Sequence, residues 1–173
     1  MLENKKIIMI DLGACNSWTD VSKILKKYGI KYYTYSFISK NGIVKHGRSA
    51  DNQPHWGERI YRQAGHLEGW SGRLNSSSGS DMRIIAEEYQ KKYNEVLDRK
   101  EVHIRVVDCT DAEDPEQETI MIEEYLITET MKHNGGCAPL GNKDTKTRKR
   151  SLKAKNTMAA ARLFEGFDLE NFS

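Results

Sequence analysis

The segment 31–49, KYYTYSFISKNGIVKHGRS, carries more reactive side chains than a β-hairpin needs in order to fold. Tyr33 and Tyr35 are two residues apart on its first strand, so they share one face of that strand. Lys45 on the return strand is expected to lie near them, and a cation lowers the pKa of a phenol from its usual value of about 10. Tyr35 is then able to take a proton from water as a general base. Gly47 has no side chain and would let a substrate backbone approach closely.

Two later segments supply groups that bind phosphate and metal. The stretch 56–67, WGERIYRQAGHL, has Arg59 and Arg62 three residues apart and His66 four residues further on, which puts them on neighbouring turns of one helix face. A guanidinium binds phosphate through two parallel hydrogen bonds. Glu123 lies in the helical stretch IMIEEYLI, where a carboxylate can hold a hard cation such as Mg²⁺. Together these groups are sufficient to hydrolyse a phosphodiester.

Each of these residues also has a purely structural interpretation. Tyrosines on a strand are usually packing residues of a half-buried sheet. Lys45 resembles a solvated lysine of an edge strand. Arg59 and Arg62 can pair with acids on a solvated helix face, and Glu123 is one of many acids on its helix. The chemistry therefore depends on whether the fold brings these groups together.

Local signals place the candidate residues on a small α/β (α+β) domain. Asn41-Gly42 between two apolar stretches predicts a hairpin turn. The hairpin and one later strand are expected to form a three-stranded sheet flanked by helices. The predicted elements are a strand over 5–12, a helix over 21–28, strands over 31–39 and 43–48, helices over 56–67 and 81–97, a strand over 101–109 and a helix over 116–132. We expect three regions: an N-terminal strand–helix extension (1–30), a core (31–142) and a basic C-terminal tail (143–173).

Composition and charge limit the class of protein. The chain has 173 residues, of which 30% are charged and 38% hydrophobic, as in ordinary soluble domains. No apolar run approaches the length of about 20 residues that spans a bilayer. The three cysteines are widely spaced, which fits a reducing compartment, so we expect a cytoplasmic protein with no membrane partner. The segment 143–155 holds seven Lys or Arg residues and one Asp, a pattern that attracts nucleic-acid phosphates.

The order of these motifs resembles the GIY-YIG nuclease superfamily. YTY (33–35) is similar to the first motif of that family, with Tyr35 at its last position, and KHG (45–47) is similar to the second, with Gly47 as its glycine. The resemblance covers about residues 31 to 142 and continues through HWGERIYRQAGH (55–66) as the arginine helix, IEEYLI (122–127) as the glutamate helix and APLGN (138–142) as the Pro-x-x-Asn ending.

The resemblance implies a DNA endonuclease that needs one Mg²⁺ or Mn²⁺ ion and uses a tyrosine-activated water as nucleophile. In that scheme Tyr35, activated by Lys45, is the general base. Arg59 stabilises the charge that builds on the phosphate, and Glu123 holds the metal. The further catalytic candidates are Tyr33 and His66. The residues expected to contact DNA, double-stranded in this scheme, are His46, Arg48, Arg62, Asn142, Lys146, Arg148, Lys149 and Arg150.

Several alternatives stay open at this point. Arg62 competes with Arg59 as the arginine that aligns with the family, and Asn134 competes with Asn142. Lys45 stands where the second motif of the family has a tyrosine, so a non-catalytic nucleic-acid-binding module with a degenerate nuclease core is the second hypothesis. A small protein-interaction domain is the third. A chain of this size that cuts both DNA strands would act as a homodimer or cut twice.

Overall fold

The computed structural model describes residues 6–50, 60 and 80–142 of the 173-residue chain. The fold in this part of the chain is α+β, as the sequence predicts. It comprises the strands β1 (Ile7–Asp11), β2 (Tyr32–Ser39), β3 (Gly42–Ala50) and β4 (His103–Asp108) and the helices α1 (Trp18–Lys27), α3 (Ser80–Tyr93) and α4 (Pro115–His133). Short 3₁₀ helices are η1 (Leu12–Ala14), η2 (Arg99–Glu101) and η3 (Leu140–Asn142).

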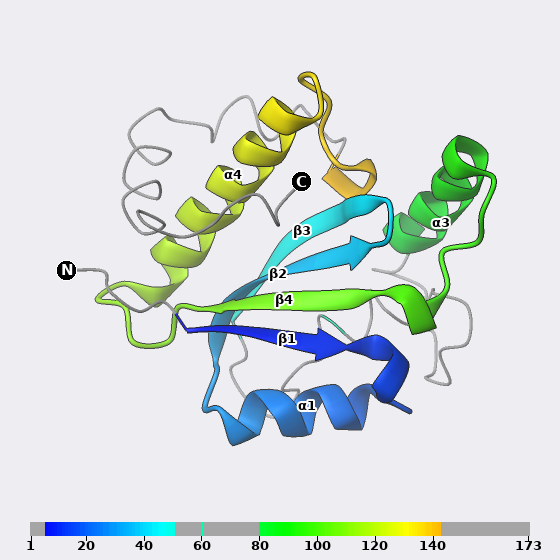
Figure 1. The fold of residues 1–173 in the computed structure, drawn as a ribbon. Coiled ribbons are helices and arrows are strands. Elements are labelled where there is room, and N and C mark those ends of the chain that lie inside the picture. The colour runs from blue at the N-terminus through cyan, green and yellow to red at the C-terminus, as the bar shows by residue number, and fades with distance from the viewer. Residues whose placement is uncertain (1–5, 51–59, 61–79, 143–173) are drawn as a thin grey trace.

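The strands form one antiparallel sheet in the order β1-β4-β2-β3 (Figure 1). The predicted sheet of three strands is therefore wrong in its strand number, because β1 pairs with β4 and forms the edge opposite β3. The register places Ile8 opposite Val106 and Ile10 opposite Ile104, so β1 adds apolar side chains to a face that β4 also buries. The strand–helix unit before residue 31 thus shares its sheet with the hairpin that follows.

Two buried clusters hold helices to the two faces of the sheet. α4 covers one face through Ile122 and Leu126, which pack with Ile43 and Val107. α1 and α3 cover the other face, and full burial of each such side chain stabilises the fold by about 1.5–3 kcal/mol. The buried members of this second cluster include Ile10, Val21, Leu25, Tyr33, Tyr35, Phe37, Ile60, Ile85, Tyr89, Ile104 and Val106.

Capping residues fix the limits of α4, the helix that carries Glu123. The side chain of Asp114 accepts a hydrogen bond from the backbone N–H of Gln117 at 3.1 Å, and Pro115 occupies the first helical turn. Gly135 and Gly136 follow the helix with φ values of 63° and 88°, a conformation that favours glycine and ends helices.

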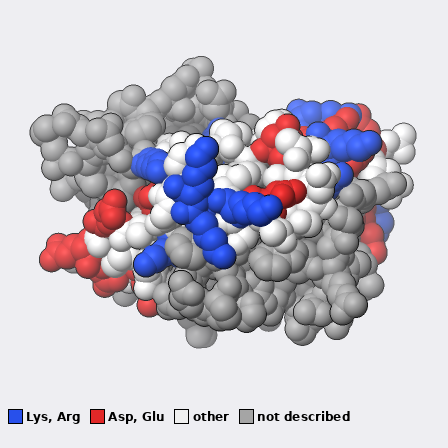
Figure 2. Space-filling model, turned by 90° about the horizontal axis from the view of Figure 1, so that it is seen from below, with Lys and Arg blue, Asp and Glu red and all other residues white. Residues whose placement is uncertain are grey.

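The described surface is divided by charge. Asp111, Glu113, Asp114 and Glu116 are exposed around the start of α4. Lysines are exposed along α1, and Figure 2, which looks at the molecule from below, shows Lys and Arg side chains gathered in the middle of this face. Among the described helices, none combines the length and the apolar character that a membrane crossing requires.

Candidate active site

The hairpin turn differs by one residue from the sequence prediction. Ser39 pairs with Gly42, so the two loop residues are Lys40 and Asn41, not Asn41 and Gly42. Gly42 follows the loop with a φ of 108°, which explains why a glycine is needed there. The Asn-Gly pair therefore marks the hairpin correctly but shifts the expected turn by one position.

The hairpin register is set by an irregularity near this turn. Ile38 pairs with Ile43, whereas the preceding residue of β2, Phe37, pairs with Lys45, which leaves Val44 as an extra residue on β3. Because side chains alternate along a strand, this shift decides which residues of β3 share a face with the tyrosines.

The extra residue brings Tyr35 and Gly47 together. Gly47 lies opposite Tyr35, where an unshifted register would place His46. A Cβ atom added at Gly47 would lie 2.4 Å from Cζ and 2.5 Å from the hydroxyl oxygen of Tyr35. Only a glycine at position 47 leaves room for the Tyr35 ring. The ring covers Gly47 in the way that aromatic side chains often cover a glycine on the adjacent strand. The space above Gly47 is thus filled by Tyr35, and the sequence-based expectation that a substrate backbone uses it is corrected.

Tyr33, Tyr35 and Phe37 form a ladder of rings along β2. The ring centroids of Tyr33 and Tyr35 are 6.2 Å apart, and those of Tyr35 and Phe37 are 5.7 Å apart in an edge-to-face arrangement. All three rings belong to the cluster packed by α1 and α3, and Tyr35 is only 1% exposed. Tyr33 lies opposite Ser49, one alternation beyond Gly47. Packing is sufficient to explain the burial of Tyr33.

Lys45 is a cross-strand neighbour of the tyrosines, and the extra residue Val44 puts it on the same face as Tyr35. It is opposite Phe37 and therefore diagonal to Tyr35, a separation of about 7–8 Å that a long side chain can bridge. The residue is 9% exposed, so it is not a solvated edge lysine. A Cβ atom added at Gly141 would lie 2.7 Å from the Cβ of Lys45, which shows that η3 packs against the aliphatic part of this side chain.

Arg48 and Glu123 form an ion pair on the opposite face of the sheet. The Nε atom of Arg48 is 3.4 Å from Oε2 of Glu123, and the side chains are 42% and 22% exposed. Arg48 directly follows Gly47 on β3. The Tyr35 ring, which comes from β2, therefore covers Gly47 on one face of β3, and the Arg48–Glu123 pair lies at the next residue on the other face.

His46 is held between β2 and α4 by both ring nitrogens. Nδ1 lies 2.7 Å from the hydroxyl of Ser36, and Nε2 lies 2.8 Å from the hydroxyl of Thr130. Thr130 donates its own proton to the carbonyl of Leu126, so the imidazole Nε2–H donates to Thr130 and Nδ1 accepts from Ser36. The residue is fully buried. This geometry gives His46 a structural role in place of the predicted DNA contact.

Asn142 completes the outer edge of β3. Its carboxamide oxygen accepts a hydrogen bond from the backbone N–H of His46 at 2.7 Å, and its amide donates to the His46 carbonyl at 2.9 Å. The side chain thus substitutes for one residue of a further strand and satisfies two backbone groups that an edge strand leaves unpaired. Asn142 is buried. The structure accounts for it as a brace of the hairpin, whereas the sequence suggested a DNA contact.

The remaining predicted residues lie outside the described part of the chain. They are Arg59, Arg62, His66, Lys146, Arg148, Lys149 and Arg150. Ile60, which is described, is fully buried in the cluster that contains Tyr33 and Tyr35. Within the described ranges no three His, Cys, Asp or Glu side chains group together as metal ligands. Asn134, the alternative to Asn142, caps the end of α4.

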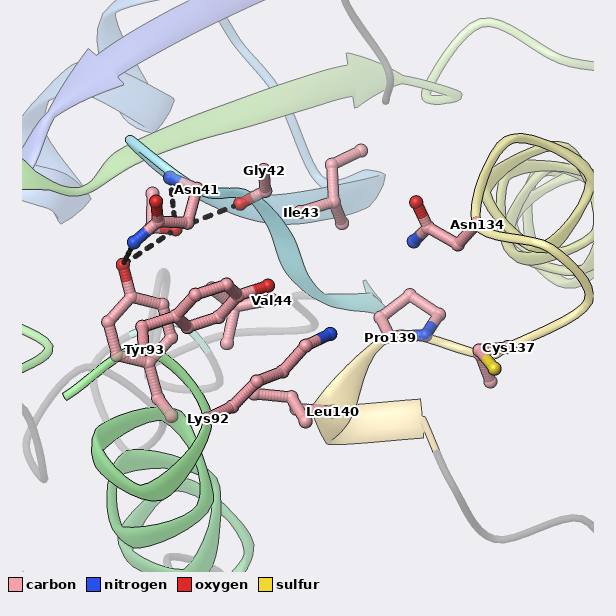
Figure 3. Close-up of a pocket in the computed structure, with 13 residues that line it drawn as sticks. Asn41, Gly42, Ile43, Val44, Lys92, Tyr93, Asn134, Cys137, Pro139 and Leu140 are labelled. Carbon is pink, nitrogen blue, oxygen red and sulfur yellow. Dashed lines mark hydrogen bonds between the residues drawn. The ribbon is translucent and has the colours of Figure 1, made fainter. Parts of the chain in front are cut away.

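A pocket of 240 Å³ lies apart from the candidate residues, at the turn end of the hairpin (Figure 3). Asn41 donates hydrogen bonds to the hydroxyl of Tyr89 at 2.7 Å and to Glu95 at 3.3 Å, which ties the turn to α3 and the residues after it. The sequence does not predict this pocket, because its walls come from segments far apart in the chain. The lining residues from β2, the turn, β3 and α3 are Ser39, Asn41, Gly42, Ile43, Val44, Tyr89, Lys92 and Tyr93, and those after α4 are Asn134, Cys137, Ala138, Pro139 and Leu140.

Comparison of the chain with protein-family models, with curated proteins and with solved structures found no match.

Proposed function

We propose that this chain is a divalent-metal-dependent DNA endonuclease that hydrolyses phosphodiester bonds with a water molecule activated by Tyr35. The observation that carries this proposal is the arrangement on β3. The Tyr35 hydroxyl lies over Gly47 on one face of this edge strand, and the pair of Arg48 and Glu123 lies at the next residue on the opposite face. A base, a phosphate-binding cation and a metal-binding carboxylate are the groups that phosphodiester hydrolysis needs.

The proposed roles follow from the side chains themselves. Tyr35 accepts the proton of the attacking water, and Lys45, on the same face, favours the phenolate form. Arg48 is exposed enough to donate to a phosphate oxygen. We assign the stabilisation of the transition-state charge to Arg59, which lies outside the described residues.

The residues present fit one Mg²⁺ or Mn²⁺ ion. Magnesium keeps several water ligands and is usually bound by one or two carboxylates together with substrate phosphates. Glu123, partly exposed beside Arg48, would hold it, and the ion would neutralise charge on the leaving oxygen. The ion pair between Arg48 and Glu123 can also exchange its partners. When the Glu123 carboxylate binds the metal, the Arg48 guanidinium becomes available to bind a phosphate of the DNA.

A non-catalytic DNA-binding module is the second candidate, and one observation favours it. Tyr35 and Lys45 are 1% and 9% exposed, whereas a general base must meet water. In this alternative the aromatic ladder only packs the sheet, and binding depends on the basic residues. The three cysteines are free thiols, so for either candidate we propose a reducing, cytoplasmic compartment.

A plasmid assay separates the two candidates. The purified full chain is incubated with supercoiled plasmid in Mg²⁺, in Mn²⁺ and in EDTA. The endonuclease predicts nicked or linear DNA only with metal, and linear DNA through two successive cuts or a homodimer. Binding that shifts the plasmid in a gel without any cut in either metal would support the non-catalytic module.

A further inference from the structure

The outer face of α1 carries a row of exposed lysines that the proposed active site does not use. Lys23, Lys26 and Lys27 are spaced so that they project from neighbouring turns of one helix face. Lys6, before β1, and Lys31, before β2, are exposed at the C-terminal end of the same helix. We call these five residues the lysine ridge. Figure 2 shows lysine and arginine side chains gathered on the face seen from below, the side on which α1 lies in Figure 1.

The stability of the fold explains only part of the lysine ridge. Lys26 and Lys27 lie in the last turn of α1, where cations interact favourably with the helix dipole, but Lys23 lies outside that turn. Val21 and Leu25 of α1 are fully buried against the sheet and already anchor the helix. Within the described residues, the structure shows no ion pair for Lys23, Lys26 or Lys27. Like charges three and four residues apart on a helix destabilise it by about 0.2–0.5 kcal/mol per pair. A binding partner with negative charge would offset this repulsion.

An exposed aromatic ring lies among these ammonium groups. Tyr28 is 41% exposed. The Nζ atom of Lys6 is 4.3 Å from the centre of its ring, and that of Lys27 is 5.6 Å away. Lys6 also donates a hydrogen bond to the Tyr28 carbonyl at 3.4 Å, which holds this cation at the end of the helix. Lysine ammonium groups and tyrosine hydroxyls both contact the phosphates of duplex DNA in known complexes.

We infer that the lysine ridge binds the phosphate backbone of duplex DNA, as a second contact beside the active site. This inference rests on the proposed function, in which DNA is the substrate. A duplex presents about one negative charge per 1.7 Å of its axis, so several phosphates fall along the 6 Å or so between Lys23 and Lys27. The acids around the start of α4 adjoin the Lys31 end of the ridge, because the backbone N–H of Lys31 donates to Thr110, next to Asp111; they would repel DNA there and leave the part along α1 for the duplex.

The apolar side of α1 decides between DNA and an anionic membrane as the partner. Helices that lie in a membrane interface present a wide apolar face to the lipid. The apolar residues Val21 and Leu25 of α1 are instead buried against the sheet. The ridge therefore offers charge and one phenol ring, which suits a phosphate backbone.

The lysine ridge lies far from the proposed active site, so its role would be to position the DNA. α1 lies along the β1 edge of the sheet, whereas Gly47 and Arg48 belong to β3 at the other edge (Figure 1). Three strand spacings separate the edges by about 14 Å, which is about four base-pair steps of DNA. A duplex that touches both sites therefore extends more than about four base pairs beyond the cleaved bond. Loss of the ridge should weaken binding and leave the chemical step intact.

The test compares two triple variants of the full chain with equal changes in charge. Lys23→Ala/Lys26→Ala/Lys27→Ala removes the centre of the ridge, and Lys91→Ala/Lys92→Ala/Lys100→Ala removes three exposed lysines elsewhere. Alanine is the best helix former, so both variants should fold, and circular dichroism checks this. The readouts are the Kd for a 30-base-pair duplex, its dependence on KCl, and the rate of plasmid cleavage at saturating protein.

The inference predicts a Kd for the duplex that is higher by about tenfold in the ridge variant and a salt slope that falls by about 0.9 for each lysine in contact with a phosphate. The control variant keeps the wild-type Kd, and the cleavage rate at saturation is equal in all three proteins. Equal weakening by both variants, or no weakening by the ridge variant, overturns the inference. Tighter binding of the wild type to phosphatidylserine vesicles than to the duplex overturns it as well. If none of the three proteins cuts plasmid but only the ridge variant binds the duplex weakly, the endonuclease proposal is wrong and the DNA-binding role of the lysine ridge is supported.

Discussion

Gly47 shows that a glycine in a sequence motif can serve the packing of its own hairpin. The residue was expected to admit a substrate, but its missing side chain is where the Tyr35 ring lies. The sequence could predict that Lys45 lies near Tyr35, but not that the two side chains share a face. It could not predict that Gly47 is directly opposite Tyr35, because that pairing depends on the extra residue Val44.

Replacing Gly47 by alanine should destabilise the protein by about 1–3 kcal/mol, because the new methyl group overlaps the Tyr35 ring. Urea unfolding measures this loss. The cost should shrink when Tyr35 is alanine in the same chain, since the overlap is then removed. If the losses in unfolding free energy of the two single variants simply add in the double variant, the Tyr35 ring does not contact Gly47.

Asn142 gives a second prediction about a single residue. Asn142→Ala removes both partners of the His46 backbone and should lower the free energy of unfolding by about 2 kcal/mol or more, since buried unpaired groups are costly. Asn142→Asp keeps the acceptor for the N–H but loses the donor, so it should also destabilise. A variant with wild-type stability and weakened DNA binding would instead favour the DNA contact that the sequence suggested.

At the scale of the elements, local patterns were informative and long-range pairing was not. Apolar periodicity and caps predicted α1, α3 and α4 and the three strands β2, β3 and β4 to within a few residues at most of their ends. β1 was also expected as a strand, yet its partner β4 begins more than 90 residues later in the chain, and nothing in either segment specifies that pairing. The fourth strand of the sheet was therefore missed.

The hairpin turn is tied to the residues after α3 by a charge cluster that predicts a pH dependence. Lys40 lies 2.9 Å from Glu95 and 3.6 Å from Glu101. The hydrogen bond from Lys40 lowers the pKa of Glu95 below its usual value. A carboxylate with a lowered pKa stabilises the folded state above its unfolded pKa of about 4.3 and loses this contribution as the pH falls through the folded value.

Glu95→Gln should therefore lower the Tm slightly at pH 7, and the difference from the wild type should vanish at acid pH. The effect is small because these groups are exposed and screened by solvent. Glu113→Gln, at an exposed position on the loop before α4, serves as the control and should show no such pH dependence. A Tm difference for Glu95→Gln that persists at pH 3 would show that the ion pair is not its cause.

For the whole molecule, the fold assigns different surfaces to different tasks. The edge strand β3 carries the proposed chemistry on both of its faces, and α1 at the opposite edge carries the lysine ridge. The acidic residues near the start of α4 adjoin the Lys31 end of the ridge. This division predicts that charge removal on α1 changes affinity, whereas substitutions beside β3 change the rate of cleavage.

The endonuclease proposal is tested most directly by the rate of plasmid cleavage in Mg²⁺ for Tyr35→Phe, measured beside wild type and Tyr33→Phe. Phenylalanine keeps the ring over Gly47 and removes only the hydroxyl, so the fold should be retained, as thermal unfolding can verify. We predict a rate lower by about 10²–10⁴-fold for Tyr35→Phe, the usual contribution of a general base, and a rate near wild type for Tyr33→Phe. A Tyr35→Phe protein that cuts DNA as fast as the wild type would contradict the role of this tyrosine.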